Sequence, residues 1–312
     1  MTTDLAVEFA NFLDEVRRRS SNPALDPATV RDVAESIHLA TKEPDGVSYA
    51  EVDAGGVEAL WCIPAHSHPA AVLVHTGGCV VGSSMHSDRK AAAHIAKAAG
   101  VRTLVLNYRR APGSKFPEQI DDVSNAYRWL LNLGYRSENV ACVGHSIGGN
   151  LAVSLALRLR DEGAPLPGAV LSISPWCDMT LSRKSIEGNA GNDKLLSRPL
   201  LESFRSSWLD GTGIGWEDPR VNLLEADLSG LPPIAVFYGE HELFASEAFE
   251  FALRAKQARN ETMIRPVPAG QHSFIMAAGR VPDVDDAIKA MGSWLRSHLG
   301  LEPCTNLVVH QT

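Results

Sequence analysis

Hydrophobic residues recur in two different patterns along this chain. Near its beginning they stand three or four positions apart, at Leu5, Phe9, Phe12, Leu13 and Val16. That spacing places them on one face of a helix and predicts a helix over 4–19, with a second short helix over 28–40. From about residue 45 the pattern changes, because apolar and polar residues alternate over 47–64 around a Gly-Gly pair. This alternation predicts an antiparallel hairpin.

Short apolar runs then alternate with helical stretches through the rest of the sequence. The runs predict strands at 70–74, 102–107, 140–143, 169–173, 234–238 and 263–267. The stretches between and after them predict helices at 87–99, 117–133, 149–160, 246–258 and 283–299. Continuous apolar strands separated by helices are typical of a mostly parallel sheet with helices on both faces. The sequence therefore predicts an α/β fold.

One segment breaks this alternation. Residues 179–222 carry no clear strand, and a long interruption in a compact domain is usually functional, often a lid. Together with residues 1–44 the segment is predicted to form a helical cap over one end of the sheet. The core then has two parts, 45–178 and 223–300, and residues 301–312 are predicted to be a tail.

Charge and composition exclude several classes of protein. The 312 residues include 29 Lys and Arg against 37 Asp and Glu, a net charge of −8, and no basic stripe, which argues against nucleic-acid binding. No apolar run reaches the roughly 18 residues of a membrane-spanning helix. At the N-terminus acidic residues lie among the apolar ones and the basic residues come last, the reverse of a secretory signal, so a cytoplasmic protein is expected.

The cysteines number five, which is odd, and form no C-x-x-C pair. They are predicted to be reduced, buried thiols rather than a disulfide framework or a zinc site. His66 and His68 form the spacing of a metal-ligand pair, but no acidic residue or cysteine lies near them in the sequence. No metal and no organic cofactor is therefore expected.

The strongest chemical motif is Gly144-His145-Ser146-Ile147-Gly148, a G-x-S-x-G. An apolar strand precedes it and an Ala/Leu-rich helix follows, the setting of a nucleophile elbow. The flanking glycines leave room for a strained backbone at Ser146, and the helix N-terminus directs N–H groups toward a negative charge formed there. The alternative is a Gly-rich turn between strand and helix with a capping serine.

A second glycine motif follows the strand at 70–74. Gly77 and Gly78 expose backbone N–H groups, which acyl transfer needs to bind the oxyanion of its tetrahedral intermediate. With the N–H of Ile147 they are predicted to form a three-donor oxyanion hole. The alternative is an ordinary turn at the end of a strand.

An acid and a histidine follow in the order that a serine hydrolase of the α/β type requires. Glu240 and Glu242 come directly after the strand at 234–238, and His272 follows the last strand. A serine hydroxyl becomes a good nucleophile only when a base takes its proton, and a carboxylate must orient that base.

These motifs together resemble the hormone-sensitive-lipase family of α/β-hydrolases, a group of bacterial small-ester hydrolases. The matching stretches, in order, are HTGG at 75–78, NYRRAP at 107–112, GHSIGG at 144–149, SPWCD at 174–178 and GEHEL followed by QHSF at 239–274. The resemblance covers about residues 70–300 and implies an α/β-hydrolase fold with a helical cap.

Carried over residue by residue, the resemblance makes Ser146 the nucleophile, His272 the base and Glu242 the acid. The family usually has Asp at the acid position, so Glu240 and Asp178 stay open as rival carboxylates. The family also has an acid where this chain has His145, which we interpret as a supporting residue rather than the base. Thr76 replaces the first glycine of the HGGG motif, which does not supply an oxyanion donor.

The cap is predicted to contribute apolar side chains to a substrate pocket. The candidates are Phe9, Leu13, Leu201, Phe204 and Trp208. At helical spacing such residues are first of all core residues, and an apolar cap suits a small hydrophobic ester or lactone.

The prediction is a serine hydrolase of small, apolar, short-chain carboxylic esters that works through an acyl-enzyme intermediate. A lactone hydrolase, a deacetylase of a small metabolite and an acyltransferase use the same residues and stay open. A non-catalytic binding protein on the same fold is the alternative from another class. The partners are then a small ester or lactone, with no nucleic acid and no membrane. Family members often dimerise through the last strand, so the resemblance also allows a homodimer.

Overall fold

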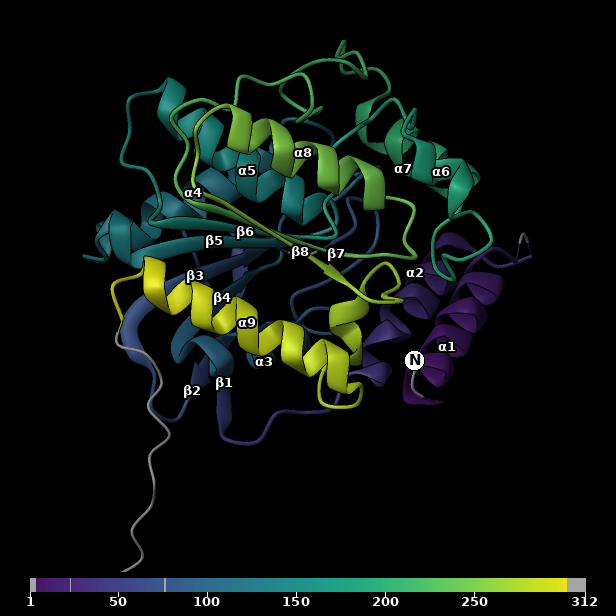
Figure 1. Cartoon of the computed structure of the whole chain (residues 1–312), viewed down its shortest axis with the longest axis horizontal. Coiled ribbons are helices and arrows are strands. Elements are labelled where there is room, and N and C mark those ends of the chain that lie inside the picture. Colours follow the sequence, from purple (N-terminus) through teal and green to yellow (C-terminus); the bar gives the residue numbers. More distant parts are fainter. Residues whose placement is uncertain (1–3, 23, 76, 302–312) are drawn as a thin grey trace, which may run out of the picture.

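The computed structural model describes residues 4–22, 24–75 and 77–301, whose strands form one eight-stranded sheet with helices on both faces (Figure 1). The strand order across the sheet is β1-β2-β4-β3-β5-β6-β7-β8. β2 runs antiparallel to β1 and β4, and every other neighbouring pair is parallel. The predicted hairpin and the predicted mostly parallel sheet are both confirmed.

The strands agree with the apolar runs of the sequence to within a few residues. They are β1 (Val47–Asp53), β2 (Glu58–Pro64), β3 (His68–His75), β4 (Val101–Leu106), β5 (Val140–His145), β6 (Ala169–Ile173), β7 (Ile234–Gly239) and β8 (Thr262–Val267). Every residue of β5, β6 and β7 is buried, as expected for central strands covered on both faces.

The helices fill the intervals between the strands. They are α1 (Asp4–Ser20), α2 (Pro27–Glu35), α3 (Arg89–Ala99), α4 (Glu118–Asn132), α5 (Ile147–Asp161), α6 (Lys184–Gly188), α7 (Arg198–Leu209), α8 (Ala245–Gln257) and α9 (Pro282–His298). The helix predicted over 28–40 is shorter than expected, because α2 ends at Glu35 and a 3₁₀ turn, η1 (Ser36–Ala40), follows. Helices often tighten to this geometry at their ends.

Two hydrophobic layers lie on the two faces of the sheet. α3 and α9 cover one face, and α4, α5 and α8 cover the other (Figure 1). Fully buried leucines such as Leu151 on α5 and Leu295 on α9 anchor the two layers. The loops at the carboxyl ends of β5, β7 and β8 therefore begin from strands that are packed on both faces.

The first of the two segments predicted to form the cap contains α1, α2 and η1, and the second contains α6 and α7. α2 begins with an N-cap at Asp26, whose carboxylate accepts hydrogen bonds from the N–H groups of Ala28 and Thr29. In α1 the residues Leu13 and Val16 are buried. The boundaries of the cap stay a prediction, and below we call residues 4–44 and 179–222 the cap segments.

Candidate functional site

Ser146 lies at the sharp turn between β5 and α5, with φ 59° and ψ −123°. A non-glycine residue rarely adopts a positive φ, and such strain persists only where the surroundings enforce it. Here the Ser146 N–H donates to Ile173 O at 2.9 Å, and Trp176 N–H donates to Ser146 O at 3.2 Å. The strained backbone therefore presents the Ser146 hydroxyl at the carboxyl end of the sheet.

Gly144 is the residue that makes this turn possible. A Cβ atom at position 144 would lie 1.8 Å from Gly148 O, far inside van der Waals contact. The obstacle is backbone rather than a side chain that could rotate away. The first glycine of the motif is thus a steric requirement of the elbow.

Replacing Gly144 by alanine is expected to destabilise the fold by about 3 kcal/mol and to displace Ser146, because the elbow backbone must open. Urea unfolding and ester hydrolysis measure the two effects. Gly188→Ala is the matched control, since nothing lies within 4 Å of a Cβ built at Gly188 in α6. A Gly144→Ala protein with wild-type stability would contradict the steric argument.

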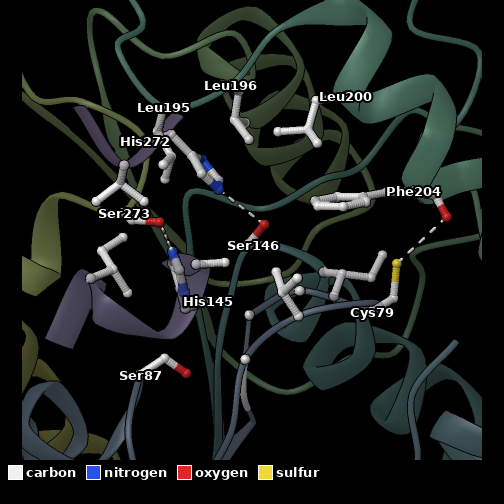
Figure 2. A pocket seen from close by; sticks show the side chains of 18 of the residues that line it. Cys79, Ser87, His145, Ser146, Leu195, Leu196, Leu200, Phe204, His272 and Ser273 are labelled. Carbon is white, nitrogen blue, oxygen red and sulfur yellow. Dashed lines mark hydrogen bonds between the residues drawn. The ribbon is translucent and has the colours of Figure 1, made fainter. Parts of the chain in front are cut away.

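His272 stands in the loop that follows β8, and its Nε2 lies 3.0 Å from Ser146 Oγ (Figure 2). The Phe244 ring packs against the imidazole in a T-shaped arrangement, with ring centroids 5.1 Å apart and planes at 90°. Burial lowers the pKa of His272 well below its ordinary value, so the ring is neutral in the resting state. A neutral imidazole at hydrogen-bond distance can accept the serine proton.

Glu242 lies in the loop after β7, and its Oε2 is 3.6 Å from His272 Nδ1. The side chain is completely buried, and burial raises the pKa of its carboxyl group. The loops that carry Glu242 and His272 touch directly, because His241 N–H donates to Gly270 O at 3.0 Å. The Glu242 carboxyl group therefore lies beside the second nitrogen of His272, where an imidazolium would favour its ionised form.

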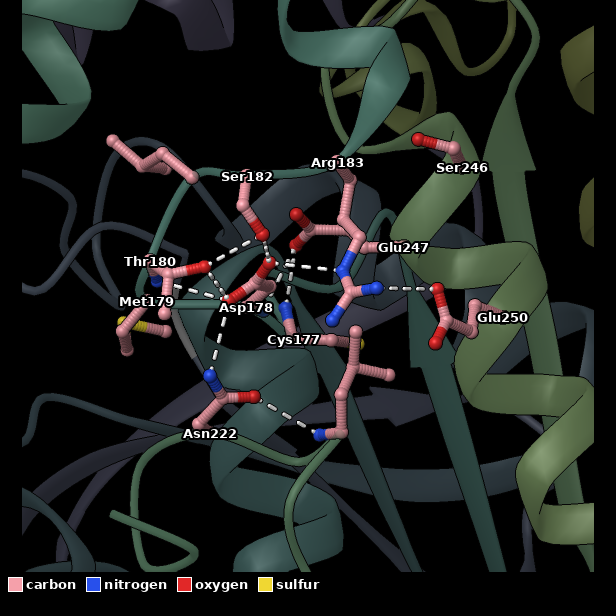
Figure 3. Close-up of polar contacts among 12 residues, drawn as sticks. Cys177, Asp178, Met179, Thr180, Ser182, Arg183, Asn222, Ser246, Glu247 and Glu250 are labelled. Carbon is pink, nitrogen blue, oxygen red and sulfur yellow. Dashed lines mark hydrogen bonds and ion pairs between the residues drawn. The ribbon is translucent and has the colours of Figure 1, made fainter. Parts of the chain in front are cut away.

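Neither rival carboxylate has a contact with His272 among those of the described residues. Asp178 accepts hydrogen bonds from Thr180, Ser182, Asn222 and Arg183, with Arg183 Nε at 3.0 Å (Figure 3). Glu240 is exposed to solvent. Of these three candidates, Glu242 is the one that the structure places against His272.

Gly77 and Gly78 lie in the loop after β3, where neither position has room for a side chain. A Cβ on Gly77 would lie 2.8 Å from His145 Nδ1, and one on Gly78 would lie 2.5 Å from Val81 O. The hydroxyl of Tyr108 lies 3.2 Å from Gly77 O and 3.3 Å from Gly78 O, so it can donate to these carbonyls and hold the loop. Ile147 is the first residue of α5. Thr76 lies outside the described residues.

His145 is a second buried histidine next to the first. Its ring centroid is 5.4 Å from that of His272, and its Nε2 lies 2.9 Å from Ser273 Oγ (Figure 2). Burial and the proximity of His272 lower the pKa of His145. It makes no hydrogen bond to Ser146 among those of the described residues, which agrees with a supporting role. Asp88, 3.9 Å from its Nδ1, is buried and has its pKa raised to about 7.

A cavity of about 140 Å³ opens beside Ser146 and is lined mainly by apolar side chains. Both cap segments contribute to its wall: Val16, Val30 and Ile37 from the first, and Leu196, Leu200, Leu201 and Phe204 from the second. Phe204 and Cys79 lie together at one side of Ser146 in Figure 2. Burial raises the pKa of the Cys79 thiol to about 12, so it is a neutral wall residue.

Three of the five candidate pocket residues lie elsewhere. Leu13 is buried in the hydrophobic layer on the α3 and α9 face, and Phe9 lines a separate surface hollow. Trp208 packs edge-on against Phe116 and donates its indole N–H to Gln119 Oε1 at 2.9 Å. Helical spacing identifies a buried face but does not say which surface that face meets. Leu201 and Phe204 do line the cavity.

Sequence reasoning did not identify three residues that shape the site. Tyr108 holds the glycine loop, Phe244 packs on the His272 ring, and Asp193 joins the second cap segment to the Glu242 loop. Tyr108 lies in the NYRRAP stretch of the family resemblance, and this match was the sequence signal that could have identified it. In the described residues, no three His, Cys, Asp or Glu side chains are grouped to hold a metal ion, and no helix is long and apolar enough to cross a bilayer. The four described cysteines are free and buried.

Comparison with known proteins gives one consistent family. Residues 71–276 match the α/β-hydrolase fold family. An acetyl-hydrolase from Streptomyces hygroscopicus is 32% identical over 252 residues, which cover 80% of this chain and 83% of that protein. An ethyl acetate hydrolase from Pseudomonas putida is 29% identical, covering 76% of this chain and 75% of that enzyme.

Solved structures agree with the sequence relatives. An esterase of the bacterial hormone-sensitive lipase family superposes with a TM-score of 0.90 at 32% identity, covering 96% of this chain and 100% of that one. A hormone-sensitive lipase from a metagenome library gives a TM-score of 0.85 at 28% identity, covering 93% and 97%.

Proposed function

Because this chain belongs to the hormone-sensitive-lipase family of α/β-hydrolases and is a carboxylic ester hydrolase, we propose that Ser146, His272 and Glu242 are its catalytic triad. The observation that carries the assignment is the 3.0 Å contact between His272 Nε2 and Ser146 Oγ on a strained elbow. The buried Glu242 carboxylate on the far side of the imidazole supports it.

The reaction then proceeds in two halves. His272 Nε2 takes the proton of the Ser146 hydroxyl while Oγ attacks the ester carbonyl carbon, and the carbonyl oxygen becomes an oxyanion. The intermediate collapses, the carbon–oxygen bond to the alcohol breaks, and His272 gives its proton to the leaving alkoxide. Water then attacks the acyl-enzyme, again losing a proton to His272, and the acid leaves with Ser146 restored.

The N–H groups of Gly77, Gly78 and Ile147 are proposed to bind the oxyanion. Their positions support this, because Gly77 and Gly78 lie in the loop that follows β3 and Ile147 begins the helix behind Ser146. Backbone donors in a water-poor site stabilise an oxyanion strongly, and losing one such donor elsewhere costs about 10²- to 10³-fold in rate.

The substrate is proposed to be a small, apolar, short-chain ester. The cavity at Ser146 is below the usual range of sites for drug-sized ligands, and leucines and Phe204 form much of its wall. Relatives named for acetyl esters and ethyl acetate support a short acyl chain. A lactone passes through the same tetrahedral intermediate and stays an alternative. A homodimer stays a prediction; β8 is an edge strand of the sheet.

Hydrolysis of p-nitrophenyl esters from acetyl to dodecanoyl tests the substrate class. The rate is expected to peak at short chains and to fall steeply once the acyl chain outgrows the cavity. A fluorophosphonate probe, which labels activated serines, is run in parallel. A maximum at long chains would overturn the short-chain proposal, and a folded protein that neither hydrolyses nor labels would overturn the triad. Small lactones form the second substrate series.

A further inference from the structure

A buried carboxylate, Asp193, is hydrogen-bonded to the loop that carries the proposed acid. It is 1% exposed and stands between α6 and α7 in the second cap segment. Its Oδ1 accepts hydrogen bonds from the N–H groups of Leu195 (2.9 Å) and Leu196 (2.8 Å). Its Oδ2 accepts one from Leu243 N–H at 2.9 Å, the residue after Glu242. One side chain therefore connects the cavity wall to the acid loop.

Three more hydrogen bonds join residues near Asp193 to the acid loop and to the loop that carries His272. The Asn189 amide donates to Glu240 O at 3.0 Å and to Glu242 O at 2.9 Å. The Lys194 N–H donates to Gln271 Oε1 at 2.8 Å, beside His272. Residues 189–196 thus bind both the acid loop and the base loop, while Leu195 and Leu196 line the cavity.

Asp193 contacts the acid loop with a charged group, whereas Asn189 uses a neutral amide and Lys194 uses its backbone N–H. Burial raises the pKa of its carboxyl group, whereas His272 and the three N–H donors favour the ionised form. Its negative charge in turn raises the pKa of His272, against the larger opposite effect of burial. Three backbone N–H groups satisfy this buried carboxylate, and no cationic side chain is hydrogen-bonded to it among the described residues, so no ion pair neutralises its charge.

Given the triad proposed above, we propose that Asp193 is a positioning residue that fixes the acid and base loops and, together with Glu242, stabilises the imidazolium formed on His272 during hydrolysis. The cap segment would then supply part of the electrostatic field at the base. Catalysis and the placement of the cavity wall are coupled through one side chain.

The sign of the effect follows from the groups that face His272. Glu242 lies at 3.6 Å, Asp193 acts from the cap segment, and His145 faces the ring from β5. Burial keeps His145 neutral, although Asp88 lies 3.9 Å from its Nδ1. Removing the Asp193 charge therefore lowers the pKa of His272 and makes its protonated form harder to reach.

Asp193→Asn is the first variant, because Asn Oδ1 can still accept from Leu195 and Leu196. We expect kcat/KM to fall about tenfold, KM to stay within about twofold, and the acid limb of the pH profile to move about one unit lower. Measurements with p-nitrophenyl butyrate run from pH 9 down to the lowest pH at which the wild-type protein and the variants stay folded. If the Asn amide, which faces the Leu243 N–H, prevents folding, Asp193→Ser removes the charge without that clash.

Asn189→Ala is the matched control, since it removes two hydrogen bonds between the same segments but no charge. It is expected to lower activity without moving the acid limb. If Asp193→Asn and Asp193→Ser also leave the acid limb of the pH profile in place, Asp193 has only a structural role and the proposal is overturned. Failure of the triad itself looks different, because the wild-type protein would then not react with the fluorophosphonate probe.

Discussion

Ser146→Ala is expected to lower kcat/KM by about 10⁵-fold or more and to leave the fold intact. Alanine removes the hydroxyl that lies 3.0 Å from His272 Nε2, so no acyl-enzyme can form. It keeps the Cβ atom, and the strained backbone at φ 59° carries the same conformational cost in both proteins. Burst kinetics with p-nitrophenyl butyrate, probe labelling and thermal unfolding measure rate, acylation and stability.

Ser273→Ala is the control for this experiment, because Ser273 is also buried and also lies at hydrogen-bond distance from a histidine, His145. It is not on the elbow, so the variant is expected to keep labelling by the probe and measurable turnover. Residual hydrolysis by Ser146→Ala above about 10⁻³ of the wild-type rate would assign the nucleophile elsewhere, with Ser273 as the first candidate.

Glu242→Gln is expected to reduce kcat about 10³-fold or more, with a smaller effect on KM. The amide has the shape of the carboxyl group but cannot stabilise the imidazolium on His272, and its NH₂ group can favour the wrong tautomer of the ring. Because Glu242 is completely buried, its charge acts in a low dielectric, where its loss has a large effect. Stopped-flow acylation and steady-state hydrolysis separate the two half-reactions.

Glu240→Gln makes the same chemical change two residues away, at an exposed position, and is expected to behave like the wild-type protein. A Glu242→Gln protein that loses less than about tenfold would contradict the assignment of the acid. Asp193, which accepts a hydrogen bond from Leu243 N–H in the same loop, would then be the first carboxylate to examine.

The fold was predictable from sequence because its strongest signals are local. Apolar runs such as the one at 140–143 become central strands, and the helical spacing in α1 follows directly from the chain. The elbow at Ser146 was predictable for the same reason, since strand, glycines and helix are contiguous. The choice of Glu242 over Glu240 needed the family resemblance, because both residues follow one strand.

Contacts between distant segments were not predictable. Leu13 and Trp208 stand on apolar helix faces, as Leu201 and Phe204 do, but only the tertiary arrangement decides which face meets the cavity. Asp193 carries no local motif: its partner Leu243 lies 50 positions further along the chain. A single sequence contains no signal for such a pair.

The proposed nucleophile and base are 126 positions apart, and the cavity wall draws on residues from Val16 to Met276. A ribosome therefore finishes the elbow long before it has made the loop that activates it. Under the proposed triad, a growing chain that has not yet reached His272 carries Ser146 without its base. A fragment that ends before His272 therefore lacks the proposed base and is expected not to hydrolyse esters.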